Sequence, residues 1–174
     1  KNNITKQENP PLSNMFSDIS NLKKNDELHA QESRQRIFNL GNRIWHSDSS
    51  FRPNPARYSL LSAREIPLKG GDTQYADMHS PYENLTSVMK HLIADLQCEH
   101  SLMYSRARLG MDYFTEQEKE DFKPVLQPLV RTHPSTGRRS LFLASHAGRI
   151  VGWPIPEAKL LLEGLTEIAT HKEH

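Results

Sequence analysis

The chain has 174 residues, the size of one ordinary domain. Lys and Arg (22 residues) nearly cancel Asp and Glu (21 residues), and the resulting formal net charge of +1 argues against a nucleic-acid-binding protein. A single cysteine excludes a disulfide within the chain and a multi-cysteine zinc site, and no apolar run approaches the roughly 18 residues of a membrane helix. We therefore expect one cytoplasmic domain with neither nucleic acid nor membrane as a partner.

The two ends of the sequence indicate a piece of a longer protein. The first residue is Lys1 rather than Met, and residues 171–174 follow a helical pattern without a stop signal. Residues 1–36 are polar and include the pair Pro10-Pro11, which is typical of an unstructured segment. We expect an N-terminal arm or loop over residues 1–36 and a folded domain over residues 37–174.

Short strands are predicted on either side of a glycine turn. The pattern favours one strand that ends near Asp48, a second over residues 58–66 and a third over residues 73–77. Residues 70–71 are both glycine, and they suit a tight turn between the second and third strands.

Capping signals mark the predicted helices. Residues 80–83 have the form of a capping box with proline at the first helical position, and Thr115 begins a second capping box. Between the second helix and a last helix near Pro156, residues 129–133 and 140–144 predict a β-hairpin. The first and last helices are expected to bury the apolar stripes Leu85, Val88, Met89, Leu92 and Leu96, and Leu160, Leu161, Leu165 and Ile168.

A histidine and an aspartate two residues apart form the first candidate site. On a strand, His46 and Asp48 would present their side chains on one face. An imidazole and a carboxylate are two of the three protein ligands in a 2-His-1-carboxylate iron site. Taken alone, the pair also fits an ordinary hydrogen-bonded contact at a strand end. The hydroxyl of Thr73, after the glycine turn, can donate to an anionic ligand, although the same residues suit a simple hairpin turn.

Three blocks of sequence together resemble the taurine/phenoxyalkanoate (TauD/TfdA) family of Fe(II)- and 2-oxoglutarate-dependent dioxygenases. The blocks are residues 44–51 (IWHSDSSF), 70–78 (GGDTQYADM) and 129–142 (LVRTHPSTGRRSLF). The similarity runs from about residues 18–21 to the last residue. It is closest to the phenoxyacetate (2,4-dichlorophenoxyacetate) type of member through residues 143–148 (LASHAG) and the start of the last helix.

The resemblance implies both a fold and an activity. The fold would be α+β and mainly β, with a double-stranded β-helix (jelly roll) core, flanking helices and missing parts at both ends. The activity would be hydroxylation of a small organic acid, aryloxyalkanoate- or taurine-like, with Fe(II), 2-oxoglutarate and dioxygen, giving succinate and carbon dioxide. Whether the enzyme forms a homo-oligomer stays open.

The resemblance also assigns roles to individual residues. His46 and Asp48 match iron ligands, and Thr73 matches a threonine that binds 2-oxoglutarate. His146 matches a histidine near the substrate and becomes a candidate contact for a carboxylate or ether oxygen, with a partly exposed histidine at a strand end as the alternative. The second histidine ligand and the arginine that pairs with 2-oxoglutarate are expected beyond His174. The second hypothesis is therefore a truncated, non-catalytic homologue that acts as a binding or interaction protein.

Other polar residues have ordinary interpretations. We expect His29, His91 and His100 to be solvated or to cap helices, and the two histidines at 171 and 174 to lie at a helix end or in a tail. Tyr104, Arg106 and Arg108 are expected in a loop, either over the active site or at an ordinary surface.

Overall fold

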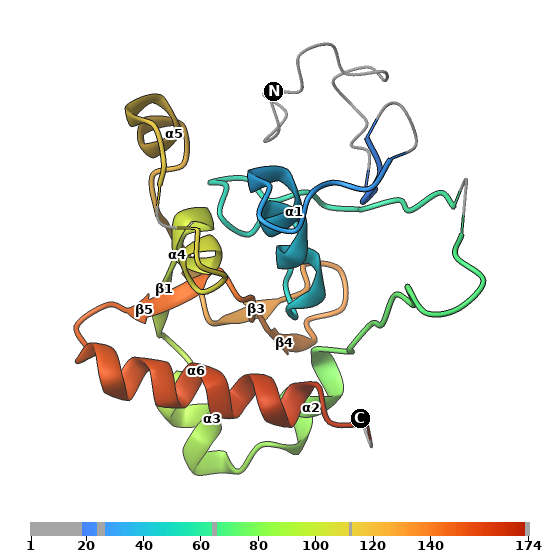
Figure 1. Cartoon of the computed structure of the whole chain (residues 1–174). Coiled ribbons are helices and arrows are strands. Elements are labelled where there is room, and N and C mark those ends of the chain that lie inside the picture. Colours follow the sequence, from blue (N-terminus) through green and yellow to red (C-terminus); the bar gives the residue numbers. More distant parts are fainter. Residues whose placement is uncertain (1–18, 24–26, 64–65, 112, 173–174) are drawn as a thin grey trace.

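Two small antiparallel sheets and the long helix α6 organise the described part of the chain (Figure 1). The structure is a computed structural model that describes residues 19–23, 27–63, 66–111 and 113–172. The predicted arm over residues 1–36 therefore lies largely outside the described residues, as does His174. Helix α1 spans the expected boundary between residues 36 and 37.

The described residues form seven helices and five strands. In chain order they are α1 (Arg34–Leu40), the 3-10 helix η1 (Gly41–Arg43), α2 (His79–Asn84), α3 (Ser87–Ile93), β1 (Gln97–His100), α4 (Leu102–Ala107), α5 (Glu116–Asp121), β2 (Val125–Pro128), β3 (Val130–Thr132), β4 (Arg139–Leu141), β5 (Ala147–Ile150) and α6 (Ile155–Ala169). None of the helices in the described part of the chain has the length and apolar character that crossing a bilayer requires.

Strand β1 lies at the centre of a three-stranded sheet with the order β2-β1-β5. Both neighbours are antiparallel to it, and Cys98 is opposite Gln127 on one side and Ile150 on the other. The register shifts between Glu99 and His100, just before the chain enters α4. The sequence pattern does not predict this strand, because its four residues carry little apolar alternation.

The predicted hairpin is confirmed as strands β3 and β4. They pair in an antiparallel register with Val130 opposite Leu141 and Thr132 opposite Arg139. The turn between them closes on itself, because the Gly137 amide donates to the His133 carbonyl. A hairpin depends on residues close in sequence, so its local turn chemistry was sufficient to predict it.

One apolar cluster joins both sheets to α6, which lies across one side of the molecule next to α2 and α3 (Figure 1). Its fully buried members include Ile93, Cys98, Leu129, Leu141 and Leu165. On α6 the buried side chains are Ala158, Leu162, Leu165 and Ala169, at the spacing of one helix face. Leu161 packs at the edge of the cluster, whereas Leu160 and Ile168 are exposed, so the predicted stripe was only partly correct.

The predicted helix after residue 80 is two helices, because the chain leaves the helical conformation at Leu85 between α2 and α3. Asp77, rather than Ser80, caps the first one. Its carboxylate accepts from the His79 and Ser80 amides and from the Ser80 hydroxyl, which together hold the pKa of Asp77 well below its usual range. Thr86 caps the second helix. As a result Val88 and Leu92 of the predicted buried stripe are exposed.

The Thr115 capping box at α5 is confirmed.

The described part of the chain contains no closed barrel, and more of its residues lie in helices than in strands. The α+β class is confirmed, whereas the mainly β expectation is wrong for these residues. Residues 58–63 and 66, predicted as a strand, run in an extended excursion away from the sheets (Figure 1), and residues 73–77 are also not a strand. Leu60 and Ile66 are 98% and 78% exposed. An extended segment becomes a strand only beside a partner that takes its hydrogen bonds, and among the described residues these segments have none.

Leu129 and Leu60 provide a matched test of this core. Leu129→Ala should lower the free energy of unfolding by roughly 2–5 kcal/mol, because Leu129 is fully buried in the apolar cluster. Leu60→Ala should change it by less than about 0.5 kcal/mol, because Leu60 contacts mainly solvent. Denaturant unfolding of both variants measures the difference, and equal effects would contradict the described core.

Candidate metal centre

The segment that carries His46 is held by a distant part of the chain. It leaves η1 in an extended conformation, and the Ser145 amide donates to the Trp45 carbonyl at 2.9 Å. The Ser47 hydroxyl donates to the Leu143 carbonyl at 2.8 Å. The predicted strand ending near Asp48 is therefore an extended segment with two cross-links rather than a strand, and a turn begins at Asp48.

The side chains of His46 and Asp48 converge, with Nε2 of His46 3.2 Å from Oδ1 of Asp48. On the other side of the ring, Nδ1 of His46 is 2.7 Å from the carbonyl oxygen of Ile44. A carbonyl can only accept, so Nδ1 carries the hydrogen and donates it. In the neutral ring, Nε2 then directs a lone pair toward a carboxylate oxygen.

Two electron-pair donors at this separation need a cation between or beside them. In the metal-free protein a proton can take that place. Asp48 accordingly raises the pKa of His46 through their hydrogen bond, and the same bond lowers the pKa of Asp48 to about 2. A divalent metal ion fits the same donor set, because metal-ligating histidines usually donate their other N–H to a carbonyl or carboxylate. The two residues thus fit one edge of an iron site.

The described residues bring no third ligand to this pair. They contain no group of three or more His, Cys, Asp or Glu side chains that could hold a metal ion. His171 lies just beyond α6 and is exposed, as expected for a residue at a helix end.

His146 lies beside His46, with the ring centroids 6.4 Å apart. Only 3% of the residue is exposed, so the expectation of a partly exposed histidine at a strand end is wrong. Its Nδ1 is 2.8 Å from the Ser105 hydroxyl, and its ring packs against the Phe51 ring in a T-shaped arrangement with the centroids 4.8 Å apart. Burial, together with the nearby Arg106 guanidinium, lowers the pKa of His146 to about 3.

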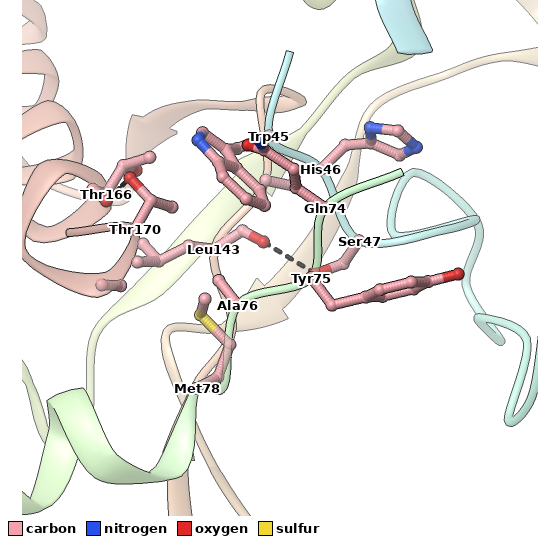
Figure 2. Close-up of a pocket in the computed structure, with 12 residues that line it drawn as sticks. Trp45, His46, Ser47, Gln74, Tyr75, Ala76, Met78, Leu143, Thr166 and Thr170 are labelled. Carbon is pink, nitrogen blue, oxygen red and sulfur yellow. Dashed lines mark hydrogen bonds between the residues drawn. The ribbon is translucent and has the colours of Figure 1, made fainter. Parts of the chain in front are cut away.

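Thr73 is exposed and is not among the residues that line the pocket near His46. Its neighbours Gln74 and Tyr75 do line this pocket together with His46, so the chain next to Thr73 passes close to the site. Figure 2 shows that the Trp45 indole points toward α6, whereas the His46 ring points the opposite way. Because alternate residues of an extended segment face opposite sides, this pocket lies mainly on the side of Trp45. The residues that line it are Trp45, His46, Ser47, Gln74, Tyr75, Ala76, Met78, Leu143, Ala144, Thr166, Ala169 and Thr170.

Two buried side chains near the site were misjudged from the sequence. Arg106 belongs to helix α4 rather than a loop, and its guanidinium carbon lies 4.3 Å from the centre of the Phe38 ring. Burial lowers the pKa of Arg106 to about 10. His100 is fully buried and stacked on Phe142 at 5.4 Å, so the expectation of a solvated or capping histidine is wrong. Burial lowers its pKa to about 4. Polar residues in a short helix or strand carry no local signal that they will be buried.

The geometry defines a histidine–carboxylate pair that is suited to a divalent cation and lies on an α+β scaffold. The sequence matches the family described as "Taurine catabolism dioxygenase TauD, TfdA family" over residues 4–174. The chain therefore belongs to the TauD/TfdA family.

Two curated relatives illustrate the similarity. The chain is 40% identical over 155 residues to the alpha-ketoglutarate-dependent 2,4-dichlorophenoxyacetate dioxygenase of Burkholderia sp. (strain RASC), an alignment that covers 89% of this chain and 52% of that protein. It is 34% identical over 167 residues to the (S)-phenoxypropionate/alpha-ketoglutarate-dioxygenase of Sphingobium herbicidovorans, covering 91% and 58%. The chain thus spans about half the length of the curated relatives it matches.

A solved structure matches the fold as well. The crystal structure of AAD-2 in complex with Mn(II) and N-oxalylglycine superposes with a TM-score of 0.86 at 55% sequence identity. The match covers 90% of this chain and 58% of that one.

The His46–Asp48 pair predicts a pH window of stability in the metal-free protein. The pKa of His46 in the folded protein is raised above 6.5. Its contribution to folding stability is therefore fully present below pH 6.5 and is lost as the pH rises through the raised pKa. The pKa of folded Asp48 is lowered from 3.8 to about 2, so its contribution is present above pH 3.8 and is lost as pH falls toward 2. Asp48→Asn should therefore lower the melting temperature most between about pH 4 and 6.5.

Melting temperatures of the parent and the variant across pH 3–9, in the presence of a chelator, measure this window. Asp72→Asn is the matched control, because it removes an exposed carboxylate from another extended segment. A difference for Asp48→Asn that does not vary with pH would contradict the charge interaction.

Proposed function

We propose that the protein carrying this chain is an Fe(II)- and 2-oxoglutarate-dependent dioxygenase that hydroxylates a small organic acid. The observation that carries the proposal is the geometry of His46, whose Nδ1 donates to the Ile44 carbonyl while Nε2 lies 3.2 Å from Asp48. His46 and Asp48 would be two of the three ligands of a 2-His-1-carboxylate site, and their side chains point toward each other. The relatives, which are named as alpha-ketoglutarate-dependent dioxygenases, support the same reaction.

Each site residue has one proposed role. His46 and Asp48 hold Fe(II), which with 2-oxoglutarate and dioxygen supplies the oxidation of a substrate C–H bond and the release of succinate and carbon dioxide. The Ile44 carbonyl fixes the orientation of the His46 ring and increases the basicity of Nε2. Thr73 donates a hydrogen bond to a carboxylate of 2-oxoglutarate, and His146 contacts the organic acid.

The ligands and substrates named for relatives support the choice of small molecules. N-oxalylglycine, which AAD-2 binds together with Mn(II), differs from 2-oxoglutarate by an N–H group in place of one CH₂ group. The relatives act on 2,4-dichlorophenoxyacetate and (S)-phenoxypropionate, as their names state. An aryloxyalkanoate is therefore the proposed substrate class.

We also propose that residues 37–174 are part of a double-stranded β-helix (jelly roll) domain. The third iron ligand and the arginine for 2-oxoglutarate would come from residues outside the described chain. Two observations support this: the chain spans about half the length of its curated relatives, and the described residues offer no group of three metal-binding side chains.

Removal of a proposed iron ligand should abolish turnover in the full-length protein. His46→Ala and Asp48→Ala should each reduce succinate formation by more than about 100-fold, because loss of even the outer partners of metal ligands costs roughly 10- to 100-fold. Succinate is measured with 2-oxoglutarate, Fe(II) and a panel of aryloxyalkanoic acids and taurine. The isolated 174-residue chain should bind Fe(II) weakly and show no substrate-coupled turnover.

The control for these variants is His91→Ala, which removes an exposed histidine of α3 and should leave turnover unchanged. Full activity of His46→Ala would contradict the proposed ligand set. An inactive full-length protein that still binds organic acids would favour the non-catalytic homologue.

Thr73→Ala should weaken the binding of 2-oxoglutarate more than the binding of the organic acid. Loss of one hydrogen bond to a charged carboxylate should raise the apparent KM for 2-oxoglutarate by roughly 10- to 100-fold, with a smaller change in the KM for the organic acid. Thr136→Ala, at an exposed threonine of the β3–β4 turn, is the control. Equal changes in both KM values would contradict the role proposed for Thr73.

A further inference from the structure

The Ser105 hydroxyl lies at the centre of a buried hydrogen-bond cluster next to the candidate metal centre. Ser105 belongs to α4 and is fully buried. Its Oγ is 2.8 Å from the Leu102 carbonyl oxygen and 3.2 Å from Nη1 of Arg106. Nδ1 of His146 is the third neighbour, at 2.8 Å. Three polar atoms therefore share one hydroxyl group.

These three contacts have one consistent assignment of hydrogens. A hydroxyl has one hydrogen to donate and two lone pairs that accept. The Leu102 carbonyl can only accept, so it takes the Ser105 hydrogen. The Arg106 guanidinium can only donate, so it occupies one lone pair of Ser105. The remaining lone pair faces His146, whose Nδ1 must therefore carry a hydrogen and donate it.

The packing around Arg106 keeps this assignment in place. Its guanidinium lies over the Phe38 ring, and a side chain at Gly41 would overlap it. Arg106 makes no ion pair among the described residues, so no carboxylate competes with Ser105 for Nη1. The Arg106 guanidinium can only donate, so it always occupies one lone pair of the Ser105 hydroxyl.

The ring that Ser105 holds borders the His46–Asp48 pair. The centroid of the His146 ring lies 6.4 Å from that of the His46 ring and 4.8 Å from that of the Phe51 ring. With Nδ1 occupied by Ser105, the only other polar atom of the ring is Nε2. A neutral imidazole that carries its hydrogen on Nδ1 offers only a lone pair at Nε2.

We propose that Ser105 is a positioning residue, which holds His146 in the Nδ1–H tautomer so that Nε2 accepts a hydrogen bond from a donor group bound at the site. The inference rests on one part of the proposed function, which is that the organic acid binds next to His146. It also refines that function. A carboxylate or ether oxygen is an acceptor and cannot be the direct partner of Nε2; the partner is a hydroxyl or N–H group of the acid, or a water molecule bound with it.

The tautomer can be read directly in the metal-free full-length protein. Two-bond ¹H–¹⁵N correlation spectra of ¹⁵N-histidine protein distinguish a protonated from an unprotonated ring nitrogen. For His146 we expect a protonated Nδ1 and an unprotonated Nε2, both without ligand and with saturating phenoxyacetate and 2-oxoglutarate. A protonated Nε2 in either state would overturn the proposal, and this result needs no variant and no turnover.

Ser105→Ala tests the positioning role. Without the hydroxyl, the Nε2 signal of His146 should move toward the protonated position, because Nδ1 loses its acceptor. Ser50→Ala is the matched control, since Ser50 is equally buried but its hydroxyl has no hydrogen-bond partner among the described residues. It should leave the His146 signals unchanged. An unchanged spectrum in Ser105→Ala would overturn the role of Ser105.

Two substrates that differ by one hydroxyl group show which group donates the hydrogen bond to Nε2 of His146. In the full-length enzyme, Ser105→Ala is compared with the parent on phenoxyacetate and on a hydroxyphenoxyacetate. A rise in KM of about 2- to 10-fold, the effect of one neutral hydrogen bond, is expected. A rise for the hydroxylated acid alone identifies a substrate hydroxyl, and an equal rise for both identifies water. No rise for either acid would overturn the contact. Because the spectra need no catalysis, failure of this inference and failure of the proposed reaction can be told apart.

Discussion

The candidate site depends on two hydrogen bonds between segments that are far apart in sequence. The Ser145 amide donates to the Trp45 carbonyl, and the Ser47 hydroxyl donates to the Leu143 carbonyl across 96 residues. Trp45 and Ser47 flank His46, so both bonds fix the backbone on either side of it. The same contact aligns the chain just before His146. The proposed iron ligands and the proposed substrate contact are therefore placed by one backbone junction.

The surroundings of this junction differ from the apolar core below it. Around α6 the buried side chains are mostly aliphatic and need no hydrogen bonds. Near the junction buried polar side chains lie among apolar ones such as Phe51 and Leu143, and they are Ser50, His100, Ser105, Arg106, Ser145 and His146. Several of their atoms have no partner among the described residues, namely the hydroxyls of Ser50 and Ser145, both ring nitrogens of His100 and Nε of Arg106. Buried polar groups without partners reduce stability, and proteins concentrate such costs at functional sites.

Family membership and site geometry contribute different parts of the functional argument. The family match and the 55% identity to AAD-2 favour a type of chemistry. The hydrogen bonds explain how individual side chains could serve it: the Ile44 carbonyl leaves a lone pair on His46 for a cation, and Ser105 leaves a lone pair on His146 for a donor. The same device, a neighbouring group that occupies Nδ1, sets the chemistry of both rings.

Sequence patterns were sufficient to predict the features whose partners lie close along the chain. The hairpin of β3 and β4 and the Thr115 capping box depend on a few adjacent residues, and the convergence of His46 with Asp48 needs only an extended backbone. Tertiary structure decided the rest. Burial of His100 and His146 requires packing by distant elements, and residues 58–63 stay unpaired because no neighbouring strand reaches them among the described residues. Local patterns encode conformation, whereas burial and strand pairing depend on which distant segments meet.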